Sequence, residues 1–252
     1  MQRYFISKNQ FVENKVHIVD EDAFHLIKVM RAKIEDQFIV SDGETRDVLV
    51  EIEEMTKSKV IASIIKELDR TNEPIINVWI AQSLPKGDKM DTIIQKNTEI
   101  GAVQFIPFIS KRTIVQYDQK KTKKRMERWN KIAKEAAEQA HRNIVPQIKE
   151  ISTWKELLKT IPEVDASFVF YENEDQIYLK DIINSKKTDH DTTPTFLMVI
   201  GPEGGFTEKE ILLLEEAGCH IVSLGKRILR TETAAMVGLT CLLYEYGEIG
   251  GS

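Results

Sequence analysis

Three short apolar runs near the end of the sequence, each leading into a glycine- or charge-bearing loop, constrain the fold more than any other feature. They are residues 167–172 (SFVFYE), 196–205 (FLMVIGPEGG) and 221–230 (IVSLGKRILR). Runs rich in Val, Ile and Phe that are separated by helical patterns are typical of parallel strands buried on both faces. Because ligands bind at the carboxyl ends of such strands, the three loops together predict a ligand site.

Composition narrows the class of protein. The chain has 252 residues, of which 42% are hydrophobic and 30% charged, as in one large or two modest globular domains. No apolar run approaches the ~20 residues of a membrane span, and the start, MQRYFIS, is too short and too soon charged for a signal peptide. Cys219 and Cys241 fit neither a disulfide framework nor a Cys-x-x-Cys site, and the histidines lack metal-ligand spacing. We therefore expect a cytoplasmic protein without a metal.

The N-terminal part of the sequence predicts a small β-rich domain. Its expected elements are a helix at 20–30 and strands at 37–40, 48–52 and 59–65. An Asp42-Gly43 turn after the first of these strands is a strong hairpin signal. This pattern favours a small closed barrel with one short helix. The polar stretch 69–74 ends in proline and separates a domain of residues 1–70 from one of residues 74–252.

The second domain alternates strands and helices, which predicts an α/β fold with a parallel sheet. Besides the three apolar runs, strands are expected at 75–81 and 103–109, and helices at 88–100, 121–143, 154–160, 180–185, 208–217 and 231–246. Pro107 indicates that its strand lies at an edge or carries a bulge.

A basic segment interrupts an otherwise acidic chain. Residues 116–142 hold nine basic and four acidic side chains, an excess of five positive charges, whereas the whole chain has a net charge of −5. Such a segment is either a solvated helix face or a surface for nucleic-acid phosphates.

The glycine-rich loop at 201–205 follows a predicted buried strand and precedes a helix, with Thr207 and Glu210 forming a capping box. Its three glycines let the backbone approach a ligand closely. It is not a phosphate loop, because it lacks Gly-Lys-Ser/Thr and because Glu203 would repel phosphate. A carboxylate among glycines suits a ligand with hydroxyl, amino or cationic groups; a tight turn without a ligand is the alternative.

The loop at 224–235 places two arginines, Arg227 and Arg230, on either side of an Ile-Leu pair. The arginines are suited to phosphates or to pairing with Glu232 or Glu203. The apolar pair suits a flat ring such as adenine, and packing in the core explains it about as well. No Ser–His–Asp order is present, so the sequence does not favour hydrolysis.

Together these loops resemble the SPOUT (α/β-knot) RNA methyltransferases, and among them the RsmE branch, which methylates N3 of a uridine in 16S ribosomal RNA. The matching segments are GPEGG at 201–205, LGxRILRxETA at 224–234, KxTEIG at 96–101, SxR at 110–112, EQxxR at 138–142 with Pro146, RYF at 3–5 and HLxxVMR at 25–31. They span nearly the whole chain in the order of the family. Met30 departs from the leucine that is usual there.

The resemblance implies a C-terminal trefoil-knot domain, an N-terminal PUA-like RNA-binding β-barrel, a homodimer, and S-adenosylmethionine as methyl donor. Carried over, the cofactor pocket comprises Tyr171, Glu172, Gly201, Pro202, Glu203, Gly204, Gly205, Leu224, Gly225, Ile228, Leu229 and Arg230. Small-subunit ribosomal RNA is the expected partner. Its contacts are expected to come from Arg3, Arg31, Lys120, Lys121, Lys123, Lys124, Arg125, Arg128 and Arg142.

The chemistry then needs groups that favour the uridine anion, because N3 must lose its proton before it attacks the methyl group. Arginine stays protonated, so Arg230, Arg142 and Arg112 are expected to stabilise charge at O2 or O4. Glu138 or Glu232 would orient one of them. Two alternative functions remain: that of a related knotted enzyme that methylates a ribose 2′-OH, and that of a non-catalytic RNA-binding assembly factor.

Overall fold

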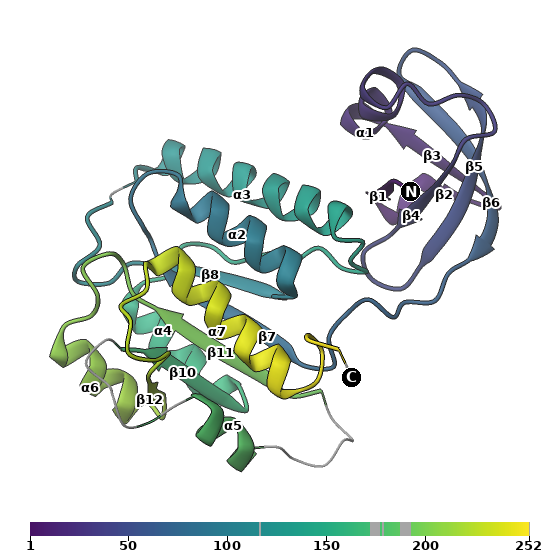
Figure 1. Ribbon diagram of the computed structural model, residues 1–252. Coiled ribbons are helices and arrows are strands. Elements are labelled where there is room, and N and C mark those ends of the chain that lie inside the picture. The colour runs from purple at the N-terminus through teal and green to yellow at the C-terminus, as the bar shows by residue number, and fades with distance from the viewer. Residues whose placement is uncertain (116, 172–176, 178, 187–192, 252) are drawn as a thin grey trace. The chain divides into compact units, whose positions relative to one another are not determined.

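The chain folds into two compact units, shown in Figure 1. The computed structural model describes residues 1–251 except 116, 172–176, 178 and 187–192. The first unit combines Met1–Glu73 with Ala137–Val145, and the second combines Pro74–Ala136 with the residues from Pro146 onward. The sequence had assigned 137–145 to the second domain, whereas these residues pack within the first unit.

The first unit is built on a six-stranded sheet in the order β1-β4-β5-β6-β3-β2. The strands are β1 (Arg3–Phe5), β2 (Phe11–Val12), β3 (Lys15–Val19), β4 (Gln37–Ser41), β5 (Asp47–Met55) and β6 (Lys59–Glu67). β1 and β4 are parallel, and the other neighbouring strands are antiparallel. No pairing joins β1 to β2 among the described residues, so the sheet is a half-barrel that stays open at its two shortest strands.

One core fills the concave side of this sheet. Val48, Val50 and Ile52 of β5 are at most 1% exposed and alternate with more exposed residues, as expected for an antiparallel sheet with one face inside. Register shifts interrupt the pairing of β5 with β6 at two places. Because such bulges bend a strand and increase its twist, they curl the sheet around the core.

The helix expected at 20–30 divides into two parts. A five-residue helix α1 (Asp20–Phe24) continues into a π-helical turn, η2 (His25–Val29); a short 3-10 helix, η1 (Lys8–Gln10), lies earlier in the chain. The Tyr4 hydroxyl lies 2.7 Å from Nδ1 of His25, the first residue of the π turn. Burial raises the pKa of Tyr4, so this phenol stays neutral and available as a hydrogen-bond partner.

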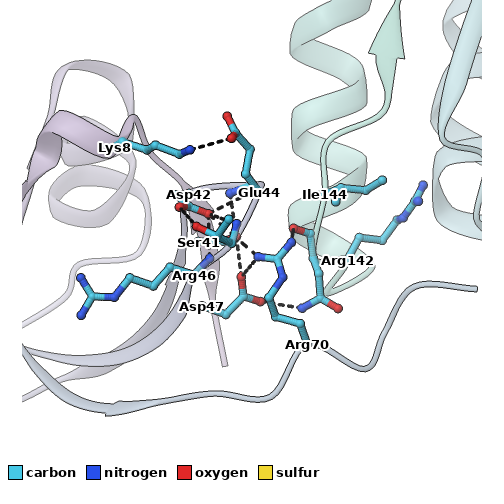
Figure 2. A network of polar contacts seen from close by, with 12 residues as sticks. Lys8, Ser41, Asp42, Glu44, Arg46, Asp47, Arg70, Arg142 and Ile144 are labelled. Atoms are coloured by element: carbon cyan, nitrogen blue, oxygen red, sulfur yellow. Dashed lines mark hydrogen bonds and ion pairs between the residues drawn. The ribbon is translucent and has the colours of Figure 1, made fainter.

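A buried carboxylate, that of Asp47, lies at the centre of the polar network in Figure 2. It is 0% exposed and accepts hydrogen bonds from Arg3 (2.5 Å), Ser41 Oγ (2.6 Å), Arg70 (2.8 Å) and Asn143 Nδ2 (2.6 Å). Four donors on one carboxylate compensate for its removal from water. The network therefore joins strands β1, β4 and β5 to the chain around residue 70 and to the 137–145 segment.

A second carboxylate, that of Glu73, fixes the 137–145 segment from the other side. It accepts hydrogen bonds from the guanidinium of Arg142 and from the backbone N–H of Asn143. Glu138 of the same segment accepts the backbone N–H of Phe5 at 3.0 Å. These contacts explain why residues 137–145 belong to the first unit.

The second unit contains an all-parallel sheet in the order β12-β10-β11-β7-β8-β9. Its strands are β7 (Asn77–Ser83), β8 (Gln104–Phe108), β9 (Gln147–Ile148), β10 (Ala166–Phe170), β11 (Thr195–Ile200) and β12 (His220–Val222). Its helices are α2 (Lys89–Ile100), α3 (Gln119–Gln139), α4 (Trp154–Thr160), η3 (Ile161–Glu163), α5 (Leu179–Lys186), α6 (Glu208–Glu216) and α7 (Thr231–Glu245). The predicted α/β class is confirmed. Pro107 lies in β8, beyond Phe105, where the pairing with the edge strand β9 ends.

Helices cover both faces of this sheet, which is why its strands are apolar on both sides. Leu197 and Val199 of β11 share a core cluster with Leu157 of α4 and Leu214 of α6. On the opposite face, Met198 lies against Gly238 of α7. No helix of the described chain is both long enough and apolar enough to cross a membrane.

Removing the Asp47 carboxylate should destabilise the first unit strongly. Asp47→Ala leaves Arg3 buried without its ion pair, and the loss of one partner of a buried pair costs about 3–5 kcal/mol. Chemical denaturation measures the change. Glu44→Ala is the matched control, since it breaks only an exposed pair with Lys8, and it should leave the denaturation midpoint unchanged. Equal midpoints for both variants would contradict the central role of Asp47.

Candidate functional site

The carboxyl ends of β10, β11 and β12 border one cavity of about 900 Å³. All three loops that the sequence singled out contribute to its wall. The lining residues are Lys89, Phe170, Tyr171, Ile200, Gly201, Pro202, Glu203, Gly205, Phe206, Ser223, Leu224, Gly225, Lys226, Arg227, Ile228, Leu229, Arg230, Thr231 and Ala234. Gly204 of the predicted set is absent from this wall, and Glu172 lies outside the described residues.

The glycine loop has the tight geometry that its sequence suggested. Gly205 has a φ of +65°, which favours glycine, and Gly201 lies so close to Phe206 that an added Cβ would come within 3.2 Å of the ring. Thr207 caps the following helix α6 through a capping box with Glu210, as the sequence predicted. The backbone of the loop therefore forms the cavity wall directly, and larger side chains are disfavoured at these two glycines.

Hydrogen bonds fix two carbonyl groups of this loop. Thr231, the first residue of α7, donates to the Gly201 carbonyl at 2.6 Å and accepts from Gln82 Nε2 at 2.9 Å. Arg112 donates to the Gly204 carbonyl at 2.6 Å. The loop is thus attached both to α7 and to the turn that follows β8.

The turn that carries Arg112 is itself held by hydroxyl groups. Ser83 Oγ lies 2.9 Å from Ser110 Oγ and 2.9 Å from Thr113 Oγ1, and Thr113 Oγ1 also accepts the Ser110 N–H at 2.9 Å. Ser83 and Ser110 are buried. This arrangement explains the Ser-x-Arg spacing: the serine anchors the turn and the arginine reaches the glycine loop.

Glu203 is paired within the protein. Its carboxylate accepts a hydrogen bond from Lys89 Nζ at 2.9 Å and from the Lys86 N–H at 3.1 Å. Desolvation disfavours its charge, but these hydrogen bonds outweigh desolvation and lower the pKa of Glu203. The hydrogen bond with Glu203 raises the pKa of Lys89 in turn. Both groups are therefore charged at neutral pH, and the pair balances its own charge.

The second loop presents an unusual apolar surface. Ile228 lines the cavity yet is 83% exposed, so packing in the core does not explain it. Leu229 beside it is partly buried, and Gly225 at the start of the loop has a φ of +107°. Arg227 and Arg230 are exposed at the same wall. The loop thus offers an apolar face between two cations.

The structure divides the predicted catalytic residues between the two units. Arg230 lines the cavity, and Arg112 contacts the glycine loop. Arg142 and Glu138 belong to the first unit, where the Arg142 side chain is 3% exposed and paired with Glu73. Arg3 is enclosed in the same way, with a side chain 3% exposed in its pair with Asp47. Both guanidinium groups, which the sequence predicted to contact RNA, are thus buried in ion pairs in this structure.

The remaining basic residues differ in their surroundings. Lys120, Lys121, Lys123 and Lys124 are exposed in the first two turns of α3, and Arg31 is exposed in the first unit. Arg125 instead pairs with Asp88, the N-cap residue of α2, at 2.8 Å, and Arg128 pairs with Asp91 of α2 at 2.6 Å. The Trp129 indole also donates to Asp91. These two arginines therefore attach α3 to α2.

Comparison with known proteins assigns the chain to a family. A family model described as an RNA methyltransferase domain matches residues 71–243, and one described as an RNA methyltransferase PUA domain matches residues 18–65. The chain is 40% identical to the ribosomal RNA small subunit methyltransferase E of Bacillus subtilis (strain 168), with 97% of each chain covered. The chain belongs to the ribosomal RNA small subunit methyltransferase E family.

Solved structures agree with this membership of the methyltransferase E family. The structure of the methyltransferase E from Neisseria gonorrhoeae, bound to S-adenosyl methionine, superposes with a TM-score of 0.86 at 32% identity and covers 97% of each chain. A protein of Legionella pneumophila in complex with bound SAM superposes with a TM-score of 0.85 at 27% identity, covering 96% of each chain. The fold of both units is thus the fold of this family.

Sequence reasoning missed part of the cavity wall. Lys89, Phe206 and Thr231 line the cavity, and none of them was named as a ligand contact. The signal for Lys89 was present, because it follows the strand β7 at the same sheet edge. Thr231 lies within the 224–235 loop that the sequence singled out, and its hydroxyl joins the start of α7 to the glycine loop.

Gly238 of α7 should be sensitive to substitution by alanine. An added Cβ would lie 2.5 Å from two ring atoms of Phe170, which lines the cavity. Gly238→Ala should therefore displace Phe170 and reduce stability by about 1–3 kcal/mol, as overpacking does. Thermal denaturation measures the loss. Thr240→Ala, at an exposed position of the same helix, should cost much less, and similar losses would show that Phe170 is not under this constraint.

Proposed function

We propose that this chain transfers the methyl group of S-adenosylmethionine to N3 of a uridine in 16S ribosomal RNA, as a knotted homodimer in the cytoplasm. One observation carries the proposal: three loops that follow three successive strands line one cavity whose residues suit this donor. The methyltransferase E of Neisseria gonorrhoeae, which shares this fold, was solved bound to S-adenosyl methionine. Small-subunit ribosomal RNA as the substrate follows from the name of that relative.

The residues of the cavity fit the donor in three respects. Its volume of about 900 Å³ lies within the ~300–1,000 Å³ of small-molecule sites. The glycine loop presents bare backbone where a Cβ at Gly201 would meet Phe206. Ile228 and Leu229 offer an apolar face to adenine, while Arg227 and Arg230 can pair with a carboxylate.

The residues of the chain then perform two tasks. S-adenosylmethionine supplies a methyl group that its sulfonium already activates. The protein therefore mainly has to position the donor and the attacking nitrogen relative to each other. The glycine loop and the 224–230 loop hold the donor, and Thr231 and Arg112 keep the glycine loop in place. Arg230, exposed at the cavity wall and permanently charged, stabilises negative charge on uridine O2 or O4 as N3 loses its proton.

The lysines of α3 are proposed to contact RNA phosphates. Positive charge near a helix N-terminus opposes the helix dipole by about 0.3–1 kcal/mol per group. Lys120, Lys121, Lys123 and Lys124 all lie in the first two turns of α3 and are exposed. Their placement does not stabilise the helix, and it creates a region of positive electrostatic potential that attracts an anion.

Methyl transfer tests the proposed reaction. The wild-type chain should bind S-adenosylmethionine in a calorimeter and should label small ribosomal subunits from cells lacking this protein, with the label on N3-methyluridine. Arg230→Ala should lower kcat about 100-fold at saturating RNA and donor, as the loss of a charge-stabilising donor does, and Arg230→Lys should retain more activity. Label on ribose would favour the knotted 2′-O-methyltransferase reading, and no donor binding would favour the assembly factor.

Salt dependence tests the RNA surface. Each lost phosphate contact should reduce the slope of log affinity against log salt by about 0.7–0.9, so Lys123→Ala with Lys124→Ala should reduce it by roughly 1.4–1.8 in filter binding. The matched control is Lys155→Ala with Lys159→Ala, two exposed lysines of α4. Equal slopes for both double variants would argue against the α3 surface.

A further inference from the structure

Lys89 joins three elements at the cavity wall. It is the first residue of α2, and its Nζ lies 2.9 Å from Glu203 Oε1 in the glycine loop and 3.7 Å from Glu232 Oε2 in the first turn of α7. The three side chains are 33%, 29% and 18% exposed, so the group is partly shielded from water. One ammonium group therefore connects the glycine loop to α7.

Both carboxylates depend on this ammonium. Glu232 Oε2 is buried and has no hydrogen-bond partner among the described residues, so Lys89 is the cation that compensates for its charge. Among the described residues, the other hydrogen bond that Glu203 accepts from a different residue comes from the backbone N–H of Lys86. Without Lys89 both carboxylates would lose this nearby cation, which lies 2.9 Å from Glu203 and 3.7 Å from Glu232, and their like charges would be less well compensated.

We propose that Lys89 is a positioning residue, which holds the glycine loop against the first turn of α7 in the geometry that binds the methyl donor. The proposal rests on the donor site of the proposed function. Two hydrogen bonds, from the Thr231 hydroxyl to the Gly201 carbonyl and from the Arg112 guanidinium to the Gly204 carbonyl, hold the same loop on either side of Glu203. The Lys89 pair fixes the residue between them, the only position of GPEGG that has an ionisable side chain.

A loop that has lost one of its contacts samples other conformations. The apparent affinity for a ligand then falls in proportion to the fraction of molecules in which the loop has its binding conformation. Lys89 acts through Glu203 and Glu232 and not on the reacting atoms. Its loss should therefore raise the KM for the donor and leave kcat at saturating donor nearly unchanged. The effect on global stability should be small, because a partly exposed ion pair contributes little to unfolding.

The test uses Lys89→Met, which keeps the length of the side chain and removes the charge. The full-length variant should bind S-adenosylmethionine about tenfold more weakly by calorimetry, with kcat within about twofold of wild type. Lys89→Arg should recover part of the affinity. The matched control is Lys96→Met, which removes another ion-paired lysine of the same helix, bound to Glu99 at 2.8 Å, and it should bind as wild type does.

A second measurement needs no ligand. Amide hydrogen exchange in the 201–206 segment should be several-fold faster in Lys89→Met than in wild type, and unchanged in Lys96→Met. Glu203→Gln should add little to the effect of Lys89→Met, since both break the same contact. Unchanged exchange, additive effects, or an equal loss of affinity in the Lys96 control would overturn the proposal. Absence of donor binding by the wild-type chain would instead contradict the proposed function, while the exchange data still decide the role of Lys89.

Discussion

Parallel pairing of β7, β10, β11 and β12 is the constraint on which the candidate site depends. Strands that run in one direction end at one edge of the sheet, so loops from distant parts of the sequence meet there. The sheet fixes the start of each loop, and a few short contacts complete the arrangement. Thr231 and Arg112 can hold the glycine loop only because their own elements begin at this same edge.

Burial decides what each arginine of this chain does. Arg3 and Arg142 are almost fully enclosed, and each has a carboxylate partner that compensates for the loss of water. Arg230 is exposed at a cavity wall, where its charge is available to a ligand. The same type of side chain is thus enclosed in ion pairs in one unit and exposed at a cavity wall in the other.

Sequence patterns predicted the parallel sheet, the limits of α4, the capping box of α6 and the three loops, because each depends on neighbouring residues or on strand direction. They did not predict that 137–145 would leave the second unit, since that depends on Asp47 and Glu73, which lie far away in the chain. They also could not decide whether Ile228 is a core residue, because only the fold shows that it is 83% exposed. Pairings such as Lys89 with Glu203 span more than a hundred residues and leave no local pattern.

The discontinuity of the first unit has a consequence for its synthesis. Asp47 accepts a hydrogen bond from the Asn143 amide, and Arg3 donates one to the Arg142 carbonyl, so both buried groups take partners from the 137–145 segment. A nascent chain that has emerged only as far as Glu73 contains all six strands of the half-barrel but lacks these partners. The N-terminal unit therefore completes its fold only after residue 145 has left the ribosome, when the first two strands of the second sheet have already been made.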